Sequence, residues 1–168
     1  MKMADINKTI ENLKKNNFIV NFVKSAEDAR NLIIQKIPKG SSIGFGGSVT
    51  LEKIGIIDYF RNSTEYDLID RTAAFTSEQK AQISHECLDA EYFLTGANGL
   101  TEDGKIVNID YRGNRVAAMI FGPTKVFVVA GTNKISSNIE SSIKRIRQVA
   151  VKKNAQRLNW KVPCINSD

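Results

Sequence analysis

Apolar residues repeat along the chain with two periods, one typical of helices and one typical of strands. Spacings of three and four residues predict helices that bury one face. Short runs rich in β-branched and aromatic residues predict strands. The expected helices cover 6–16, 25–37, 49–60, 76–88, 114–120 and 137–150, and the expected strands cover 18–23, 41–45, 66–69, 91–95, 106–109 and 125–130.

Three of the expected helices begin with the spacing of a capping box, in which an N-cap side chain and the residue three positions later bond to each other's backbone. Breakers mark other boundaries, because proline and glycine do not continue a helix. The helix before Pro38-Lys39-Gly40 is expected to end there. The capping pairs are Ser25 with Asp28, Thr76 with Gln79, and Ser137 with Glu140.

Strands that alternate with helices favour the α/β class, with an open, largely parallel sheet flanked by helices. No linker or composition shift divides the sequence, so residues 1–168 are interpreted as a single domain. In such sheets, ligands bind beyond the carboxyl ends of the strands. Glycine-rich strand exits are therefore candidate sites, and three are found, at 44–48, 95–99 and 131–132.

The composition, 42% hydrophobic and 25% charged over 168 residues, is that of a globular domain. No apolar run approaches the roughly 20 residues of a membrane span. The N-terminal segment is polar and has no apolar signal core, so we expect a cytoplasmic protein that is not associated with a membrane. The two cysteines, Cys87 and Cys164, are far apart and are expected to be reduced thiols.

The net charge of +6 is concentrated near the C-terminus, among apolar residues at helical spacing. This pattern is typical of a solvated helix face. No aromatic residues that could stack on bases are interleaved with the charges, so we expect no nucleic-acid partner. The basic residues are Lys144, Arg145, Arg147, Lys152, Lys153, Arg157 and Lys161.

The segment GFGGSVTLEKIG, residues 44–55, follows an expected strand and opens an expected helix. A dinucleotide fingerprint would place a third glycine where Val49 stands, although Asp67 and Asp70 lie where a ribose-binding acid is expected. A phosphate loop would require Lys-Ser or Lys-Thr after the glycines, and neither follows them. The first alternative stays open and the second is disfavoured.

A simpler interpretation is an anion held by backbone N–H groups at the turn of residues 46–48. Gly46 and Gly47 permit close approach, and the hydroxyls of Ser48 and Thr50 are within the same segment. The alternative is purely structural: the glycines make a tight turn and Ser48 caps the helix.

Polar residues also gather in 94–131, around a strand exit and the hairpin that follows it. Such loops carry binding groups, but they are also common solvated turns. Arg115 is able to grip a carboxylate or phosphate with two parallel hydrogen bonds. The candidate ligand-binding residues of this stretch are Thr95, Gly96, Asn98, Asn114 and Arg115, and the only nearby group suited to proton exchange is Glu102.

Four strings in the chain closely resemble the LUD (lactate utilisation) domain family, the group that includes LutC/YkgG-like proteins. They are GGSVTL at 46–51, TGANGLTEDGKIVNID at 95–110, GNRVAAMIFGP at 113–123 and KVFVVAGTNKI at 125–135. The resemblance implies a fold similar to the NagB/RpiA/CoA-transferase-like fold of sugar-phosphate isomerases, glucosamine-phosphate deaminases and CoA-transferases. It also implies a role in lactate oxidation, beside iron-sulfur proteins.

The resemblance leaves the reaction open. Related isomerases carry Gly-Ala-Asp at the matching strand exit, whereas this chain has Gly96-Ala97-Asn98, and an asparagine does not exchange protons near neutral pH. Glu102 is then the candidate catalytic residue, for acid-base work or as a CoA-transferase nucleophile. Longer members continue past the matching Pro-Cys into a cysteine-bearing tail, so we expect a shortened C-terminus after Cys164.

Together these observations predict that the protein binds a small anionic metabolite, phosphorylated or carboxylate, between the turn of residues 46–48 and the segment 95–115. We expect no cofactor and no metal. Two alternatives remain: a non-catalytic subunit of a lactate-oxidation system, and an enzyme resembling the sugar-phosphate isomerases or CoA-transferases. The sequence also leaves a homo-oligomer open.

Overall fold

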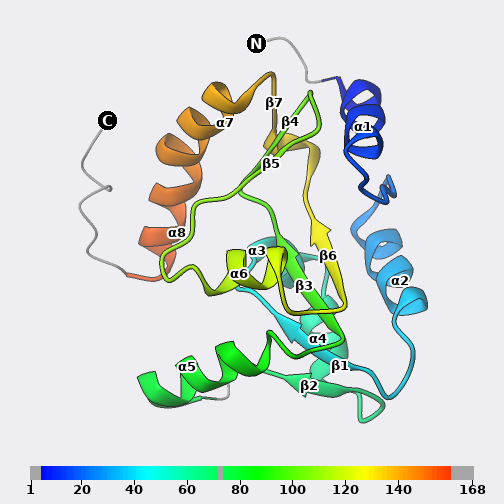
Figure 1. Cartoon of the computed structure of the whole chain (residues 1–168), viewed down its shortest axis with the longest axis vertical. Coiled ribbons are helices and arrows are strands. Elements are labelled where there is room, and N and C mark those ends of the chain that lie inside the picture. The colour runs from blue at the N-terminus through cyan, green and yellow to red at the C-terminus, as the bar shows by residue number, and fades with distance from the viewer. Residues whose placement is uncertain (1–4, 72–73, 160–168) are drawn as a thin grey trace. The chain divides into compact units, whose positions relative to one another are not determined.

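The computed structural model describes residues 5–71 and 74–159 (Figure 1). Cys164 and Lys161 lie outside these residues. The chain divides into two compact units. Unit 1 holds the described parts of 1–22, 97–109 and 130–168, and unit 2 holds the described parts of 23–96 and 110–129.

Unit 2 contains a four-stranded sheet in the order β2-β1-β3-β6 (Figure 1). Every neighbouring pair is parallel, with Gly44 opposite Phe93 and Phe93 opposite Val126. The predicted α/β class with a parallel sheet and flanking helices is therefore confirmed. The strands are β1 Ser42–Phe45, β2 Asp67–Ile69, β3 Tyr92–Gly96 and β6 Lys125–Val129.

The sheet of unit 2 is covered on both faces, because the side chains of its central strand alternate between two apolar clusters. Tyr92 and Leu94 join the larger cluster, which gathers residues of α2, α3 and α4. Phe93 points to the other face, where it packs with Cys87 and Ala118. The helices are α2 Ala26–Lys36, α3 Val49–Lys53, α4 Ile56–Arg61, α5 Ser77–Glu86 and α6 Asn114–Ile120.

Two helix starts of unit 2 follow the predicted chemistry. The Ser25 hydroxyl accepts the N–H of Asp28 at 3.0 Å. At α5, Thr76 and Gln79 form both bonds of the capping box. The single helix expected over 49–60 is wrong, because Gly55 adopts φ +70° and separates α3 from α4. A left-handed residue cannot continue an α-helix, and glycine adopts this conformation without steric cost.

Unit 1 contains α1 Ile6–Lys15 and a small three-stranded sheet in the order β5-β4-β7. The last helix begins one residue later than expected, since Asn138 and Ser141 form its capping box instead of Ser137 and Glu140. It also contains a π-helical turn. The remaining elements are β4 Gly99–Thr101, β5 Ile106–Val107, η2 Thr132–Lys134, β7 Ile135–Ser136, α7 Ile139–Arg145, η3 Ile146–Val151 and α8 Lys152–Arg157.

The strand expected over 18–23 is wrong. These residues form no strand, and the side chain of Ile19 is 92% exposed. High strand propensity expresses how well a side chain packs on a paired, half-buried surface, and this segment has no strand beside it in the described part of the chain.

Of the helices within residues 5–71 and 74–159, none combines the length and the apolar character needed to cross a membrane.

Candidate functional site

The turn of residues 46–48 leaves β1 and enters α3, as expected for a strand exit. The N–H of Gly46 donates to the carbonyl of Leu94 at 2.9 Å and so extends the ladder between β1 and β3. The expectation that this N–H is unpaired is therefore wrong. Among the described residues, the N–H groups of Gly47 and Ser48 have no hydrogen-bond acceptor. Two N–H groups of this turn, those of Gly47 and Ser48, thus remain as candidate donors to an anion.

Two of the candidate glycines are required by packing. A Cβ at Gly46 would lie 2.8 Å from Cγ of Arg115, whose aliphatic part crosses the turn. A Cβ at Gly96 would lie 2.5 Å from the Ser48 hydroxyl oxygen. Neither distance is compatible with a side chain unless the neighbour moves. Glycine at these two positions therefore lets the two strand exits and α6 lie close together.

Gly47 differs from Gly46 and Gly96, because it is exposed and has space for a side chain. The nearest atom to a Cβ at this position would be Nη2 of Arg71, at 4.0 Å. Within residues 5–71 and 74–159, no packing contact explains a glycine here. The open backbone with a guanidinium beside it is instead the arrangement expected of an anion site.

Arg115 is nearly buried, with 8% of the residue exposed. Its Nη1 donates to the carbonyl of Gly96 at 3.0 Å, and its Nε lies 3.5 Å from a carboxylate oxygen of Asp110. The other oxygen of Asp110 accepts the N–H groups of Arg115 and Val116. Asp110 therefore holds the first turn of α6 and orients the Arg115 side chain over the glycine turn.

The hydroxyl-bearing candidates of unit 2 have more local roles. The Ser48 hydroxyl accepts the N–H of Leu51 at 3.4 Å and caps α3, as the structural alternative expects. The Thr95 hydroxyl is fully buried and donates to the carbonyl of Gly96 at 3.2 Å. Thr50 lies in the first turn of α3 and Asn114 is the first residue of α6, and both are partly exposed.

Asn98 belongs to unit 1, where it joins two chain segments. Its N–H donates to the side-chain oxygen of Asn108 at 2.9 Å, and its own side-chain oxygen accepts the N–H of Ile109 at 3.0 Å. Its carbonyl accepts a hydrogen bond from Arg145 at 3.1 Å. These bonds stabilise the hairpin of β4 and β5 against α7.

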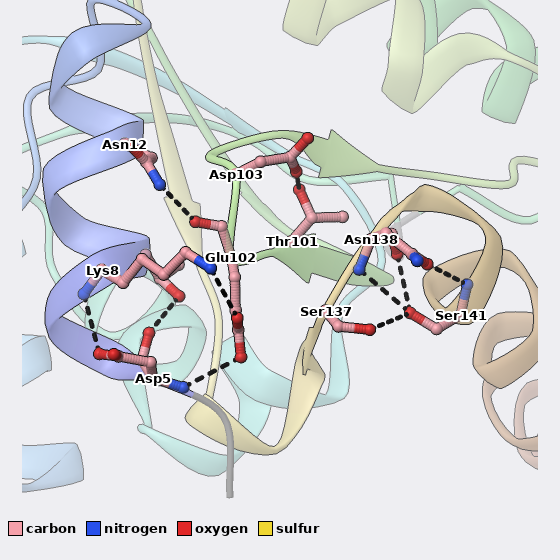
Figure 2. Close-up of polar contacts among 10 residues, drawn as sticks. Asp5, Lys8, Asn12, Thr101, Glu102, Asp103, Ser137, Asn138 and Ser141 are labelled. Carbon is pink, nitrogen blue, oxygen red and sulfur yellow. Dashed lines mark hydrogen bonds and ion pairs between the residues drawn. The ribbon is translucent and has the colours of Figure 1, made fainter. Parts of the chain in front are cut away.

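Glu102 also belongs to unit 1 and binds the start of α1 (Figure 2). Its carboxylate accepts the N–H of Asp5 at 3.2 Å and pairs with Nζ of Lys8 at 3.3 Å. Its carbonyl accepts the side-chain amide of Asn12 at 2.8 Å. The hydrogen bond from the Asp5 N–H, followed by that from Lys8, lowers the pKa of Glu102. The acid is therefore ionised at neutral pH.

Eight candidate residues lie in unit 2 and two, Asn98 and Glu102, lie in unit 1. The sequence analysis missed Arg71 and Asp110. A capping aspartate shortly before a helix is a recognisable signal, and it could have identified Asp110. Nothing local marks Arg71, which comes to Gly47 through the tertiary structure alone. The unit 2 residues are Gly46, Gly47, Ser48, Thr50, Thr95, Gly96, Asn114 and Arg115.

Within residues 5–71 and 74–159, no three His, Cys, Asp or Glu side chains are grouped so that they could hold a metal ion. Cys87 is buried beneath Gly44, and burial raises the pKa of its thiol.

Comparison with known proteins adds one finding. The model of the LUD domain family matches residues 6–167, which is nearly the whole chain. A search of curated proteins finds no match. A family match of this extent includes both the glycine turn and the segment 95–115.

Proposed function

We propose that this chain, which belongs to the LUD domain family and is thereby related to lactate utilisation, binds a small anionic metabolite at the turn of residues 46–48. The ligand is a carboxylate or phosphorylated compound. The proposal uses unit 2 alone, because the groups that carry it are all found there.

The observation that carries the proposal is the contrast between Gly47 and two other glycines, Gly46 and Gly96. Gly46 and Gly96 are glycines because Arg115 and Ser48 leave no room for a Cβ. Gly47 has room, yet it is still glycine, and the guanidinium of Arg71 lies beside it. A bare backbone that exposes N–H groups next to a cation supports anion binding, since charge-assisted hydrogen bonds are stronger than neutral ones.

Arg115 contributes a second positive charge close to the turn. Its contacts with Gly96 and Asp110 hold the guanidinium in one place. A charge fixed before the ligand arrives loses less conformational entropy on binding than a mobile one. We therefore assign Arg115 a share in attracting the anion, in addition to its structural contacts.

We propose a binding component of a lactate-utilisation system in preference to an enzyme that relies on Glu102. The lowered pKa of Glu102 disfavours proton donation near pH 7. Its hydrogen bond to the Asp5 N–H and its ion pair with Lys8 give it a structural role. Iron-sulfur proteins of the same system are the partners that we propose for such a component.

Titration calorimetry and ligand-induced thermal shifts would test the site, with lactate, inorganic phosphate and a set of sugar phosphates as probes. Gly47→Val should abolish binding while the protein remains folded, because a branched side chain occupies the space of the anion. Arg71→Gln should weaken binding about tenfold, the loss of one charge-assisted contact. Arg30→Gln, on α2 of the same unit, is the matched control and should change nothing.

An unchanged thermal shift in both Gly47→Val and Arg71→Gln would refute the site. A turnover screen with the same compounds and acyl-CoA would test the catalytic alternative. In that alternative, Glu102→Gln keeps ligand affinity and loses about 10²-fold in rate. In a binding component, Glu102→Gln leaves the affinity unchanged and there is no turnover to lose.

A further inference from the structure

Unit 2 has a groove beside the edge strand of its sheet, and none of the candidate-site residues lines it. The groove has a volume of about 600 Å³ and lies between the edge strand β2 and the end of α5. Four of its eight lining residues are acids, namely Asp67, Asp70, Glu86 and Asp89, and none is basic. In a chain with a net charge of +6, this is a local reversal of sign.

The helix beside the groove is exposed along most of its length. None of the α5 residues is buried, and Ile83, which faces the groove, is only partly covered. Asp70 is held by Arg61 at 2.7 Å, whereas Glu86 and Asp89 are on the exposed rim. The groove thus combines three apolar side chains, Leu68, Ile69 and Ile83, with a rim of carboxylates.

Unit 1 has a hollow with the opposite charge on α7 and η3. It has a volume of about 530 Å³ and is lined by Ile143, Lys144 and Arg147 together with Gln148 and one acid, Glu140. Both basic side chains are exposed. Arg145, in contrast, points inward to the carbonyl of Asn98. Both hollows therefore combine apolar and charged side chains. Acids prevail in the groove, whereas two basic residues outnumber one acid in the hollow on α7 and η3.

We propose that the chain self-associates by placing this basic face of one copy in the acidic groove of a second copy. Ile143 would lie near Ile83 of the other molecule, and Lys144 and Arg147 would meet Glu86 and Asp89. A second copy is the occupant because the chain itself carries the complementary charges, and each hollow also has apolar side chains. Because the groove and the basic face are different surfaces of the chain, the contact is heterologous.

The small area of the two hollows and their exposed charges predict a weak association. Stable protein interfaces bury about 800 Å² on each partner, and two shallow hollows of this kind provide less. The contact depends on exposed charges, which salt screens over a distance of about 8 Å at physiological ionic strength. The association is therefore weak at physiological salt and becomes stronger as the salt concentration is lowered.

Sedimentation equilibrium of the full chain at low and high salt would test the proposal with two complementary charge reversals. Glu86→Lys/Asp89→Lys changes the groove, and Lys144→Glu/Arg147→Glu changes the basic face. Each variant alone should associate at least tenfold more weakly than wild type. An equimolar mixture of the two should regain association, because the reversed groove then meets the reversed face.

Two control variants carry the same change in net charge at exposed positions elsewhere. Glu11→Lys/Glu27→Lys matches the groove variant, and Lys14→Glu/Lys36→Glu matches the other. The controls should associate as wild type does. Circular dichroism checks the fold of each variant. If Glu86→Lys/Asp89→Lys does not fold, Glu86→Gln/Asp89→Asn is used in its place.

The proposal is wrong if wild type stays monomeric at low salt and millimolar concentration. It is also wrong if the controls weaken association as much as the groove variants, or if the mixture fails to associate. Since none of these variants touches the turn of residues 46–48, their failure and the failure of the proposed function are distinguishable.

Discussion

The turn of residues 46–48 in unit 2 and the segment 98–102 in unit 1 both contain glycine and polar side chains but use their polar groups differently. Both follow a buried strand and combine glycine with hydroxyl or amide side chains. In the segment 98–102, Asn98 bonds to residues 108 and 109, and Glu102 bonds to α1. At the turn, Gly47 keeps an open backbone beside Arg71. A cluster of polar groups does not by itself mark a binding site, because hydrogen bonds within the protein can occupy all of these groups.

The contrast depends on Asp110, which holds Arg115 over the turn. Asp110→Ala should lower the free energy of unfolding by about 2–4 kcal/mol, because α6 loses its cap and a nearly buried guanidinium loses its carboxylate. Urea unfolding at pH 7 measures the loss. Asp58→Ala removes an exposed partner of Arg61 and should cost less than about 0.5 kcal/mol. Equal losses would show that Asp110 is not a structural centre of the site.

Substitutions at Gly46 and Gly47 distinguish a packing role from a binding role. Gly46→Ala should lower the free energy of unfolding by about 1–3 kcal/mol, since its Cβ meets the Arg115 side chain. Gly47→Ala should change it by less than about 0.5 kcal/mol, because there is space for the methyl group. Chemical denaturation of both variants gives the comparison. A Gly47→Ala variant as unstable as Gly46→Ala would contradict the open turn.

Ser48→Ala tests whether the hydroxyl does more than cap α3. Loss of an N-cap should cost about 1 kcal/mol, and Ser25→Ala, at the start of α2, should cost a similar amount. Thermal melts with and without phosphate measure both stability and binding. If only the cap matters, the ligand-induced shift survives in Ser48→Ala. A lost shift would instead make the hydroxyl a ligand contact.

Glu102→Gln should have the smallest effect, because its carboxylate contacts lie at the surface of unit 1. The lowered pKa means that the ionised form stabilises the fold above the ordinary value of 4.5, and this contribution disappears as the pH falls through the folded-state pKa. The difference in Tm between wild type and Glu102→Gln should therefore shrink from pH 6 to pH 3.5. Glu11→Gln, on α1, is the control. A difference that grows on acidification would contradict the contacts with Asp5 and Lys8.

Much of the fold was predictable because the signals are local. The capping box of Thr76 and Gln79, the N-cap hydrogen bond of Ser25 and the α/β class are confirmed, since caps and periodicity depend on residues close in sequence. The strand expected over 18–23 is wrong because a strand needs a neighbour, which no local pattern supplies. The helix expected over 49–60 is wrong because the left-handed conformation of Gly55 outweighs an apolar pattern that continues through it.

The candidate site was predictable as a set of segments but not as a geometry. The sequence by itself determined that glycines follow β1 and that the chain resembles the LUD domain family. Only the tertiary structure decided that Gly46 packs under Arg115, that Gly47 stays open, and that Arg71 lies beside it. The physical reason is that a hydrogen bond or a close contact between residues distant in sequence is fixed by the folded chain, whereas a turn or a cap is fixed by its own few residues.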